Sequence, residues 1–525
     1  MKQQNHYLTI LIALSFSLLL QSCSTLTKKL NNEPLSIEEL TISQAHQALL
    51  NNLISCASLT EKYITRIKKY DKASQLNSII LINPKAQTRA TTLDKEFANS
   101  NQLRPLHCIP VILKDNFDTA NMPTEAGSIA LKGSLPPDDA FMVKKLRQAG
   151  AIIIAKSNMA EWAFSPYQTI SSTHGETRNA YDLERVPAGS SGGTASAIAA
   201  NFGIIGMGTD TGNSIRGPAS HLSLVGIRST IGLTSRDGVV PLLLNRDIAG
   251  PLTRSVEDAA KTFNIIAGYD PADPITAKGR DKVKTDYTKF LKKDGLQGVR
   301  LGVMRDMFDT LEANDEVIDL MNNAIKDLQL AGATIVDPLE INEFEKLRKA
   351  TGFCSRFRYD LKNYLDSLGD SALFKSLDEV VEKEQFDKRN NGAMKWAMSV
   401  SVTPEEQSPP CVDVQGDPRR KALLDGVVKA MDENQIDAII YPSWSNPPRK
   451  LGDSESPHGN NSPTIAPHSG QPAITVPMGF TKAGLPAGLQ FLARPFDDAK
   501  LFQYAYAYEQ KTQHRKPAIL SIKKK

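Results

Sequence analysis

The chain has 525 residues, of which 62 are Lys or Arg and 58 are Asp or Glu, so its formal net charge is only +4. This balance, with no basic stripe interleaved with aromatic residues, argues against a nucleic-acid-binding protein. Hydrophobic residues make up 41% of the chain and charged residues 23%, as in ordinary globular proteins, and the length alone favours two or three domains.

The N-terminus has the pattern of a targeting segment. Lys2 precedes a mostly apolar run, residues 8–20, which is too short to span a bilayer and suits a signal-peptide core. The following Leu-Gln-Ser-Cys, ending at Cys23, resembles a bacterial lipoprotein signal, in which the cysteine becomes lipidated; an ordinary secretory signal is the alternative. We therefore expect a signal peptide over residues 1–22, a lipid on Cys23, a tether to residue 34, and a membrane-anchored protein of the bacterial cell envelope, facing the periplasm.

The next segments alternate between strand and helix patterns. Ser58 and Glu61 have the spacing of a capping box at the start of a helix. Strands are predicted at residues 78–81, 108–113, 151–155, 202–208, 299–304, 334–336, 437–441 and 473–476, and helices at 139–148, 192–201 and 314–331. Such alternation favours a mostly parallel α/β sheet. Residues 343–415 are predicted to form a helical cover over the mouth of the active site, and residues 454–469 a loop.

Two glycine-rich segments and one lysine carry the chemistry. Ser190 and Ser191 lie in Gly-Ser-Ser-Gly-Gly, Ser214 follows Gly-Asn, and Lys114 ends an apolar strand. A serine hydroxyl needs a base before it attacks a carbonyl, and a lysine can serve if burial keeps its amine neutral. The backbone N–H groups of residues 211–214, which are Thr211, Gly212, Asn213 and Ser214, could converge on a carbonyl oxygen as an oxyanion hole.

A competing interpretation uses the same serines. Residues 189–193 also fit the nucleophile-elbow motif G-x-S-x-G, with Ser191 as the nucleophile. That motif should follow a strand, but residues 182–187 before it are polar and contain a proline. The downstream candidate bases, His458 and His468, lie in polar surroundings and are predicted to be loop residues. The elbow is therefore the weaker hypothesis.

Five ordered segments together resemble the amidase signature family of serine hydrolases, which cleave carboxamides. These segments are residues 106–119, 179–200, 208–218, 241–260 and 470–509. The likeness covers roughly residues 35–517. It implies one α/β/α amidase domain over residues 35–520, with a twisted mixed β-sheet surrounded by helices, and so overrides the expectation of several domains.

The resemblance also implies roles for individual residues. Ser214 would be the nucleophile, Ser190 a proton shuttle preceded by a cis peptide bond, and Lys114 the base. Ser191 would support them by hydrogen bonding. Asn213 stands where the family usually has a second glycine, so its side chain could narrow the pocket.

Other polar residues near these motifs are expected to hold the structure together. Asp210 and Arg216 flank the nucleophile and would fix its loop through an ion pair or backbone contacts. Asp115 would form local hydrogen bonds, and structural roles are at least as favoured for Ser157 and Asn158. No metal or phosphate motif is present, so no cofactor is expected.

The spacing of the cysteines indicates neither a disulfide pattern nor a metal site. Apart from Cys23, the chain has Cys56, Cys108, Cys354 and Cys411, without CxxC pairs or metal-ligand spacing. An exported chain could form disulfides from them, but sequence cannot pair them, and we expect buried free thiols. Cys108 stands where the family commonly has glycine.

The sequence thus predicts an amidase that hydrolyses a linear carboxamide, of a small molecule or a peptide, through an acyl-enzyme. One alternative is a glutamine-hydrolysing amidotransferase subunit, which the export signal disfavours because such proteins work on charged tRNA in the cytoplasm. Another is a binding lipoprotein that has lost catalysis, which the intact Lys114, Ser190 and Ser214 disfavour. The substrate and the oligomeric state stay open, and no nucleic-acid partner is expected.

Overall fold

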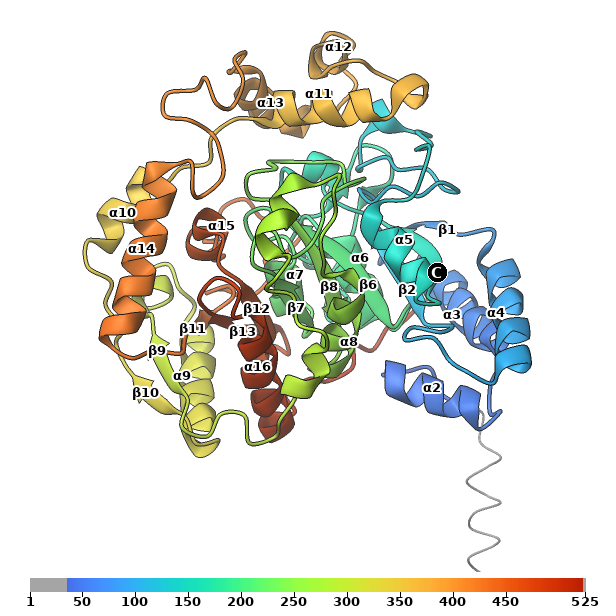
Figure 1. Cartoon of the computed structure of the whole chain (residues 1–525), viewed down its shortest axis with the longest axis horizontal. Helices are drawn as coiled ribbons and strands as arrows, with labels where there is room; N and C mark the ends of the chain where they lie inside the picture. Colours follow the sequence, from blue (N-terminus) through green and yellow to red (C-terminus); the bar gives the residue numbers. More distant parts are fainter. Residues whose placement is uncertain (1–34, 523–525) are drawn as a thin grey trace, which may run out of the picture.

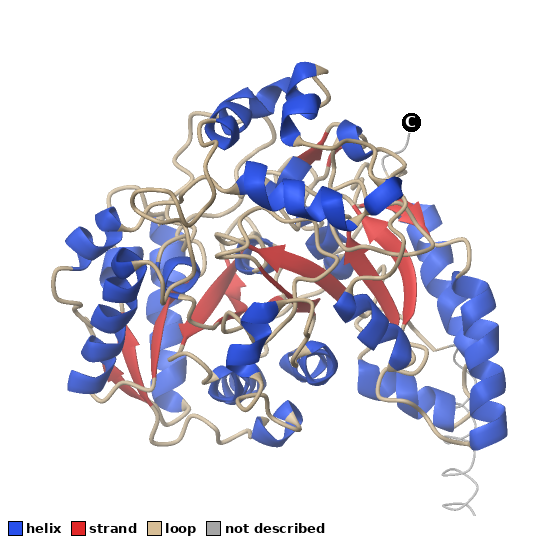
Figure 2. Ribbon diagram, turned by 45° about the horizontal axis from the view of Figure 1, so that its top comes forward, coloured by secondary structure: helices blue, strands red, loops and turns tan. Residues whose placement is uncertain are grey.

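The computed structural model describes residues 35–522, so the predicted signal peptide, Cys23 and the tether up to residue 34 lie outside it. The described chain forms one α/β domain built on a single 11-stranded sheet, in the order β1-β3-β2-β6-β8-β7-β12-β13-β11-β9-β10. Helices lie on both sides of this sheet (Figure 2). Within the described range, no helix is both long and apolar enough to cross a membrane.

The sheet is mixed, as the family resemblance implied, and the prediction of a mostly parallel sheet is wrong. Its strands are β1 (Ile79–Ile82), β2 (Pro110–Lys114), β3 (Ile152–Ser157), β6 (Ile205–Asp210), β7 (Val225–Arg228), β8 (Ile248–Thr253), β9 (Arg300–Val303), β10 (Thr334–Val336), β11 (Ala438–Pro442), β12 (Ala473–Phe480) and β13 (Pro486–Leu492). Only β2 with β3 and β6, and β9 with β10 and β11, pair in parallel. A small hairpin, β4 (Ile170–Ser171) and β5 (Gly175–Glu176), stands apart.

Three of the strands that pair only antiparallel, β7, β8 and β13, are not predicted from the sequence. Strand β8 lies between β6 and β7 at the middle of the sheet, although it contains Gly250 and Pro251. Proline cannot donate a hydrogen bond to a neighbouring strand, so it argues against a central strand when only the sequence is read. Here Pro251 faces Met207 of β6 in the register.

The helices connect and cover the strands (Figure 1). They are α2 (Ile42–Leu50), α3 (Cys56–Tyr70), α4 (Ala86–Ser100), α5 (Phe141–Gln148), α6 (Gly192–Ala199), α7 (Arg216–His221), α8 (Val256–Ile266), α9 (Asp315–Leu330), α10 (Phe344–Ala350), α11 (Phe357–Ser367), α12 (Leu377–Glu382), α13 (Asn391–Met398), α14 (Pro418–Glu433), α15 (Ile465–Ser469) and α16 (Asp498–Thr512). Helix α3 begins earlier than its predicted capping box: Ser55 is the N-cap, and its hydroxyl accepts a hydrogen bond from the N–H of Ser58.

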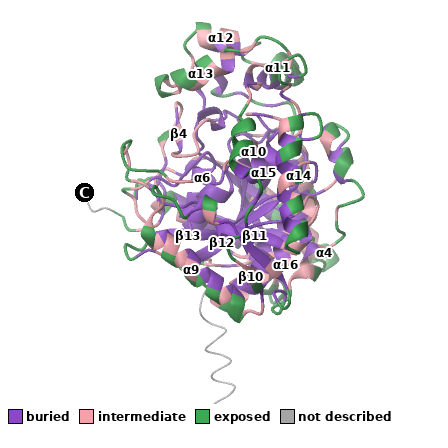
Figure 3. Ribbon diagram, turned by 90° about the vertical axis from the view of Figure 1, so that its left-hand side faces the viewer, coloured by how far each residue is buried: buried purple, intermediate pink, exposed green. Residues whose placement is uncertain are grey.

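Helices α11, α12 and α13 form a separate layer at one end of the molecule (Figure 1). Their outward surfaces are largely exposed or intermediate, whereas the sheet beneath is buried (Figure 3). Their inner side chains form a second hydrophobic cluster with residues near the ends of β2 and β3, among them Trp162 and Met159. Phe357 of α11 packs edge-on against Trp162, with ring centroids 5.7 Å apart. We call this layer, residues 355–410, the helical cover.

The prediction of free thiols is wrong, because the four described cysteines form disulfides Cys56–Cys108 and Cys354–Cys411. The paired Cα atoms lie 5.2 Å and 5.7 Å apart, in the ordinary range for disulfides. The partners are 52 and 57 residues apart, so no local spacing could reveal them. Cys108 has a φ of 63°, a backbone conformation that favours glycine and fits the family's usual residue there.

Candidate active site

Lys114 ends strand β2 and projects into the protein interior. Its side chain is fully buried, and its Nζ lies 2.7 Å from the hydroxyl of Ser190 and 2.7 Å from that of Thr209. The amide of Asn116 donates to the same Thr209 hydroxyl at 3.2 Å. Sequence reasoning missed Thr209. The pairing of the strands could have indicated it, because β6 lies parallel beside β2 and brings its C-terminal end, which includes Thr209, next to Lys114.

The surroundings of Lys114 favour its neutral form. Burial lowers the pKa of this amine to about 7, although the negative charges of Asp247 and Asp210 oppose the shift. In the described part of the chain, no carboxylate forms an ion pair with Lys114. A lysine amine surrounded by hydroxyl groups, rather than by a counter-ion, can be neutral near pH 7 and can accept a proton.

Ser190 follows a cis peptide bond, Gly189–Ser190, as the family resemblance implied. The chain is tightly packed here, because a Cβ at Gly189 would collide with the backbone carbonyl oxygens of Ser165 and Gln168. Ser191 comes next, and its hydroxyl lies 3.2 Å from the carbonyl oxygen and 3.3 Å from the N–H of Thr209. Ser191 thus ties the start of α6 to β6, which fits a supporting residue.

Ser214 lies in the turn between β6 and α7 and retains 5% of its exposure. Across residues 35–522, no hydrogen bond joins its hydroxyl to that of Ser190, so only the Lys114–Ser190 contact is formed in this state. The N–H groups of residues 211–214 find no acceptor in the same range. They are therefore available to a ligand oxygen next to Ser214, as an oxyanion hole requires.

A buried charge cluster holds this turn in place. One carboxylate oxygen of Asp210 accepts hydrogen bonds from the N–H groups of Ile215 and Arg216, and the guanidinium of Arg216 pairs with it at 3.0 Å. Arg228 lies 3.0 Å from the other carboxylate oxygen. Burial would raise the pKa of Asp210, but Arg216 and Arg228 outweigh it and hold the pKa below its usual value. Arg216 also donates to the carbonyl of Gly212 at 2.8 Å, so the predicted ion pair fixes both ends of the turn.

Asn213 is fully buried, and its side chain occupies space beside the turn. A Cβ at Gly217 would collide with the Nδ2 of Asn213, so the amide takes the volume that a side chain there would need. Thr211 donates its hydroxyl to Asp247, whose other carboxylate oxygen accepts the N–H groups of Leu242 and Leu243. The turn is thus connected to the loop that precedes β8.

The remaining predicted residues serve the framework. Asp115 accepts the N–H of Gly127 and lies 3.7 Å from Lys156. Ser157 contacts Thr194 at 2.6 Å, and Asn158 donates to the carbonyl of Gly175.

The nucleophile-elbow interpretation loses its base. His468 is not a loop residue, since it lies buried on α15 and its Nδ1 contacts Arg246 at 3.1 Å. His458 stacks on Tyr167 with ring centroids 4.3 Å apart. Neither histidine hydrogen-bonds Ser191 in the described chain.

A cavity of about 440 Å³ opens directly over Ser214. Residues 211–214 form part of its lining, and aromatic and aliphatic side chains form most of the rest. Elsewhere, the Nδ1 or Nε2 of His107 and the sulfurs of Cys56 and Cys108 lie close enough to hold a metal, but the disulfide already joins those sulfurs.

Comparison with known proteins shows the family to which this chain belongs. A model of the amidase family matches residues 58–502. The chain belongs to the amidase signature family, as its sequence motifs indicated, and the prediction of an amidase is confirmed.

Individual relatives agree with this placement. A probable amidase of Arabidopsis thaliana is 33% identical, with 97% of this chain and 96% of that protein covered. The native peptide amidase of Stenotrophomonas maltophilia superposes with a TM-score of 0.81 at 33% identity, covering 92% and 99% of the two chains. A glutamyl-tRNA(Gln) amidotransferase subunit of Rippkaea orientalis is 32% identical over 91% of this chain and 98% of its own.

The surroundings of Lys114 generate a pH prediction. Below a pH of about 7 the amine is protonated and cannot accept a proton, so kcat/KM for an amide should rise with pH through an apparent pKa near 7. Lys114→Arg should lower kcat by about 10²–10⁴-fold, because guanidinium stays protonated. The pH dependence of kcat/KM and the kcat of the arginine variant are both measured in pH–rate profiles. If kcat/KM rises only near pH 10, or if Lys114→Arg keeps most of the activity, Lys114 is not the base.

Proposed function

We propose that this protein hydrolyses linear carboxamides through an acyl-enzyme on Ser214, with Ser190 and Lys114 carrying the proton. The observation that carries the proposal is the 2.7 Å contact between the buried Lys114 amine and the Ser190 hydroxyl, beside a turn whose N–H groups have no acceptor among residues 35–522. Family membership supports amide cleavage, and the site geometry supports this assignment of roles.

In the first step, the Oγ of Ser214 forms a bond to the carbonyl carbon of the amide. The hydroxyl proton of Ser214 passes to Ser190 as the proton of Ser190 passes to the neutral amine of Lys114. The carbonyl oxygen becomes negatively charged and accepts hydrogen bonds from the N–H groups of residues 211–214, each worth roughly 3 kcal/mol in the transition state.

The intermediate then collapses. The C–N bond breaks, the carbonyl re-forms, and the proton held by Lys114 returns through Ser190 to the leaving nitrogen, which departs as a neutral amine or ammonia. Water repeats the sequence on the acyl-enzyme and releases the carboxylic acid and free Ser214. One lysine thus serves as base and then as acid in each half of the reaction.

The same proposal places the protein on the cell envelope. The apolar run at residues 8–20 and the cysteine that follows support export and a lipid on Cys23. The disulfides Cys56–Cys108 and Cys354–Cys411 agree with an oxidising compartment such as the periplasm. An extracytoplasmic location separates this protein from those relatives whose names refer to glutamyl-tRNA(Gln).

The assignment of roles predicts where a covalent inhibitor reacts. A fluorophosphonate should modify Ser214, and peptide mass spectrometry identifies the site. Ser214→Ala should abolish both labelling and turnover. Ser190→Ala should cut turnover by about 10²–10⁴-fold yet leave slow labelling at Ser214, because only the relay is lost, and Ser191→Ala should do less damage. An adduct on Ser191 would contradict the assignment.

The envelope location predicts lipid-dependent fractionation. Cys23→Ala should move the protein from the membrane fraction to a soluble or uncleaved form, because it removes the only cysteine in residues 1–34. Metabolic labelling with a fatty-acid analogue and fractionation of the expressing cells measure this. A variant that keeps the wild-type lipid label would refute the anchor.

A further inference from the structure

The cavity over Ser214 is lined without any charged side chain in the described chain. Most of its lining is apolar, including Phe353, Ala393 and Trp396, and Asn461 with residues 211–214 makes up the polar part. A carboxylate or ammonium placed here would lose its water without gaining an ionic partner, which is costly. An apolar group of the same size would instead be stabilised by leaving water.

Phe353 packs against the nucleophile turn, the turn of residues 211–214 that carries Ser214. Its Cζ would lie 3.4 Å from a Cβ built on Gly212, so the ring packs directly over this turn. The ring nevertheless keeps 41% of its exposure. An aromatic surface that lines the cavity and stays open beside Ser214 is positioned to contact the substrate.

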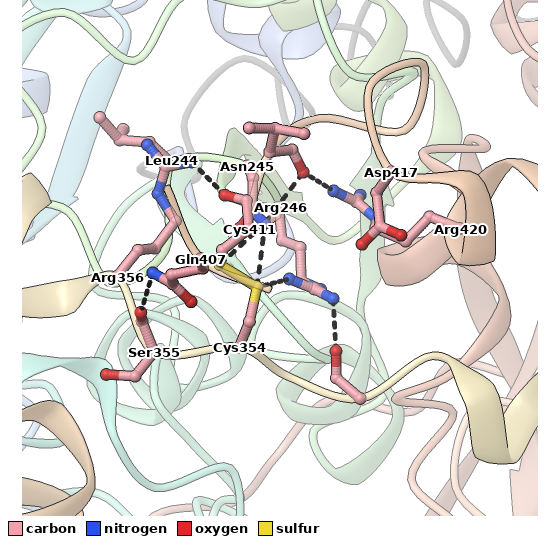
Figure 4. Close-up of a disulfide and its surroundings, with 12 residues drawn as sticks. Leu244, Asn245, Arg246, Cys354, Ser355, Arg356, Gln407, Cys411, Asp417 and Arg420 are labelled. Atoms are coloured by element: carbon pink, nitrogen blue, oxygen red, sulfur yellow. Dashed lines mark hydrogen bonds between the residues drawn. A yellow bond between two sulfur atoms is a disulfide. The ribbon is translucent and has the colours of Figure 1, made fainter. Parts of the chain in front are cut away.

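The buried Arg246 and the Cys354–Cys411 disulfide both lie next to Phe353. Arg246 lies 5.0 Å from the centroid of the Phe353 ring, and its Nη2 donates to the carbonyl of Gly352 at 2.7 Å. Its Nη1 lies 3.7 Å from the sulfur of Cys354. Arg246 thus contacts Phe353 and both of its chain neighbours, and it approaches the Cys354–Cys411 disulfide directly (Figure 4).

The disulfide is itself part of a hydrogen-bonded cluster (Figure 4). Asn245 places its Nδ2 3.6 Å and 3.7 Å from the two sulfurs and 3.1 Å from the carbonyl oxygen of Val412. Gln407 donates to the carbonyl of Ser355 at 2.9 Å. The segment that leads into the helical cover, at Cys354, and the segment that leads out of it, at Cys411, are therefore joined by a disulfide and by hydrogen bonds next to Phe353.

The helical cover supplies a further part of the cavity lining. Trp396 and Ala393 lie on α13, within the loop that the Cys354–Cys411 disulfide closes, and both line the cavity. The disulfide thus joins the two ends of the segment that carries Trp396. One of these ends is Cys354, which directly follows Phe353 in the chain. In the proposed mechanism the acyl group becomes attached to Ser214 in the first half-reaction and is released in the second, whereas the amine leaves after the first. The acyl group is therefore the part of the substrate that is present beside these walls in both half-reactions.

We propose that the site selects amides with a bulky, apolar, uncharged acyl group, that Phe353 is a specificity-determining residue for that group, and that the Cys354–Cys411 disulfide positions Phe353. This inference rests on the proposed function. It names a substrate class that excludes free glutamine, whose α-carboxylate and ammonium would find no partner in the cavity.

The test compares three primary amides, in which only the acyl side varies. 4-Phenylbutanamide carries an apolar group, glutamine is of similar length but charged, and acetamide is too small to reach the walls. In the wild-type protein, kcat/KM for 4-phenylbutanamide should exceed that for glutamine by at least about 100-fold. Comparable values for the two amides would overturn the substrate class.

Two substitutions test Phe353. Phe353→Ala should raise KM for 4-phenylbutanamide and lower its kcat/KM by roughly tenfold, while acetamide changes much less. Phe353→Leu should retain most of the preference, because it keeps an apolar wall. Equal losses for both amides, or a loss in kcat alone, would show that Phe353 does not select the acyl group.

The two disulfides provide a test variant and a matched control for the proposal that Cys354–Cys411 positions Phe353. Cys354→Ser/Cys411→Ser should reproduce the selective loss of 4-phenylbutanamide hydrolysis, whereas Cys56→Ser/Cys108→Ser should keep the ratio of the two amides. Fluorophosphonate labelling of Ser214 at the wild-type rate shows that each variant is folded. If the first pair does not fold, reduction of the folded wild-type protein should change the same ratio. An unchanged ratio with Cys354 and Cys411 removed or reduced overturns the positioning role.

Failure of this inference differs from failure of the proposed function. If Ser214 is labelled and amides are hydrolysed without regard to charge, the inference is wrong and the proposed function stands. If Ser214 is not labelled and none of the three amides is hydrolysed, both are wrong.

Discussion

A buried lysine amine with no counter-ion in the described part of the chain is the constraint around which this site is built. Lys114 lies at the end of β2, an inner strand of the sheet, where burial makes its charged form costly, and its neighbours are the hydroxyls of Ser190 and Thr209. The same burial that destabilises the ammonium ion creates a base that works near neutral pH. The parallel pairing of β2 with β3 and β6 supplies that burial, so the fold itself sets the basicity of the amine.

The turn that carries Ser214 is held in the opposite way, by a buried carboxylate that has charged partners. Asp210 takes the N–H groups of Ile215 and Arg216 and the guanidinium groups of Arg216 and Arg228. Removing one partner from such a cluster would leave an uncompensated buried charge, which typically costs about 3–5 kcal/mol. Because this cluster holds the turn from its flanks, the N–H groups of residues 211–214 need no internal acceptor and remain available to substrate.

Much of this could be predicted from sequence. Lys114, Ser190 and Ser214 are found because five ordered segments together resemble the amidase signature family, and the structure brings Lys114 and Ser190 into contact. Strand β8 with its Gly250-Pro251, the partner Thr209 and the disulfides could not be predicted. Each depends on which segments meet in space, at sequence separations that no local pattern encodes. The aromatic wall at Phe353 belongs to the same group, since only its contacts with Arg246 and Gly212 reveal it.

The protonation state of Lys114 is the central claim and can be measured directly. Lysine labelled with ¹³C at Cε gives a resonance for each amine, and the Lys114 signal is the one that disappears in Lys114→Arg. We predict that this signal titrates with a pKa near 7, far below the ordinary lysine value of about 10.4. A Lys114 signal that stays in the ammonium form to pH 9 and above would contradict a neutral lysine base at this site.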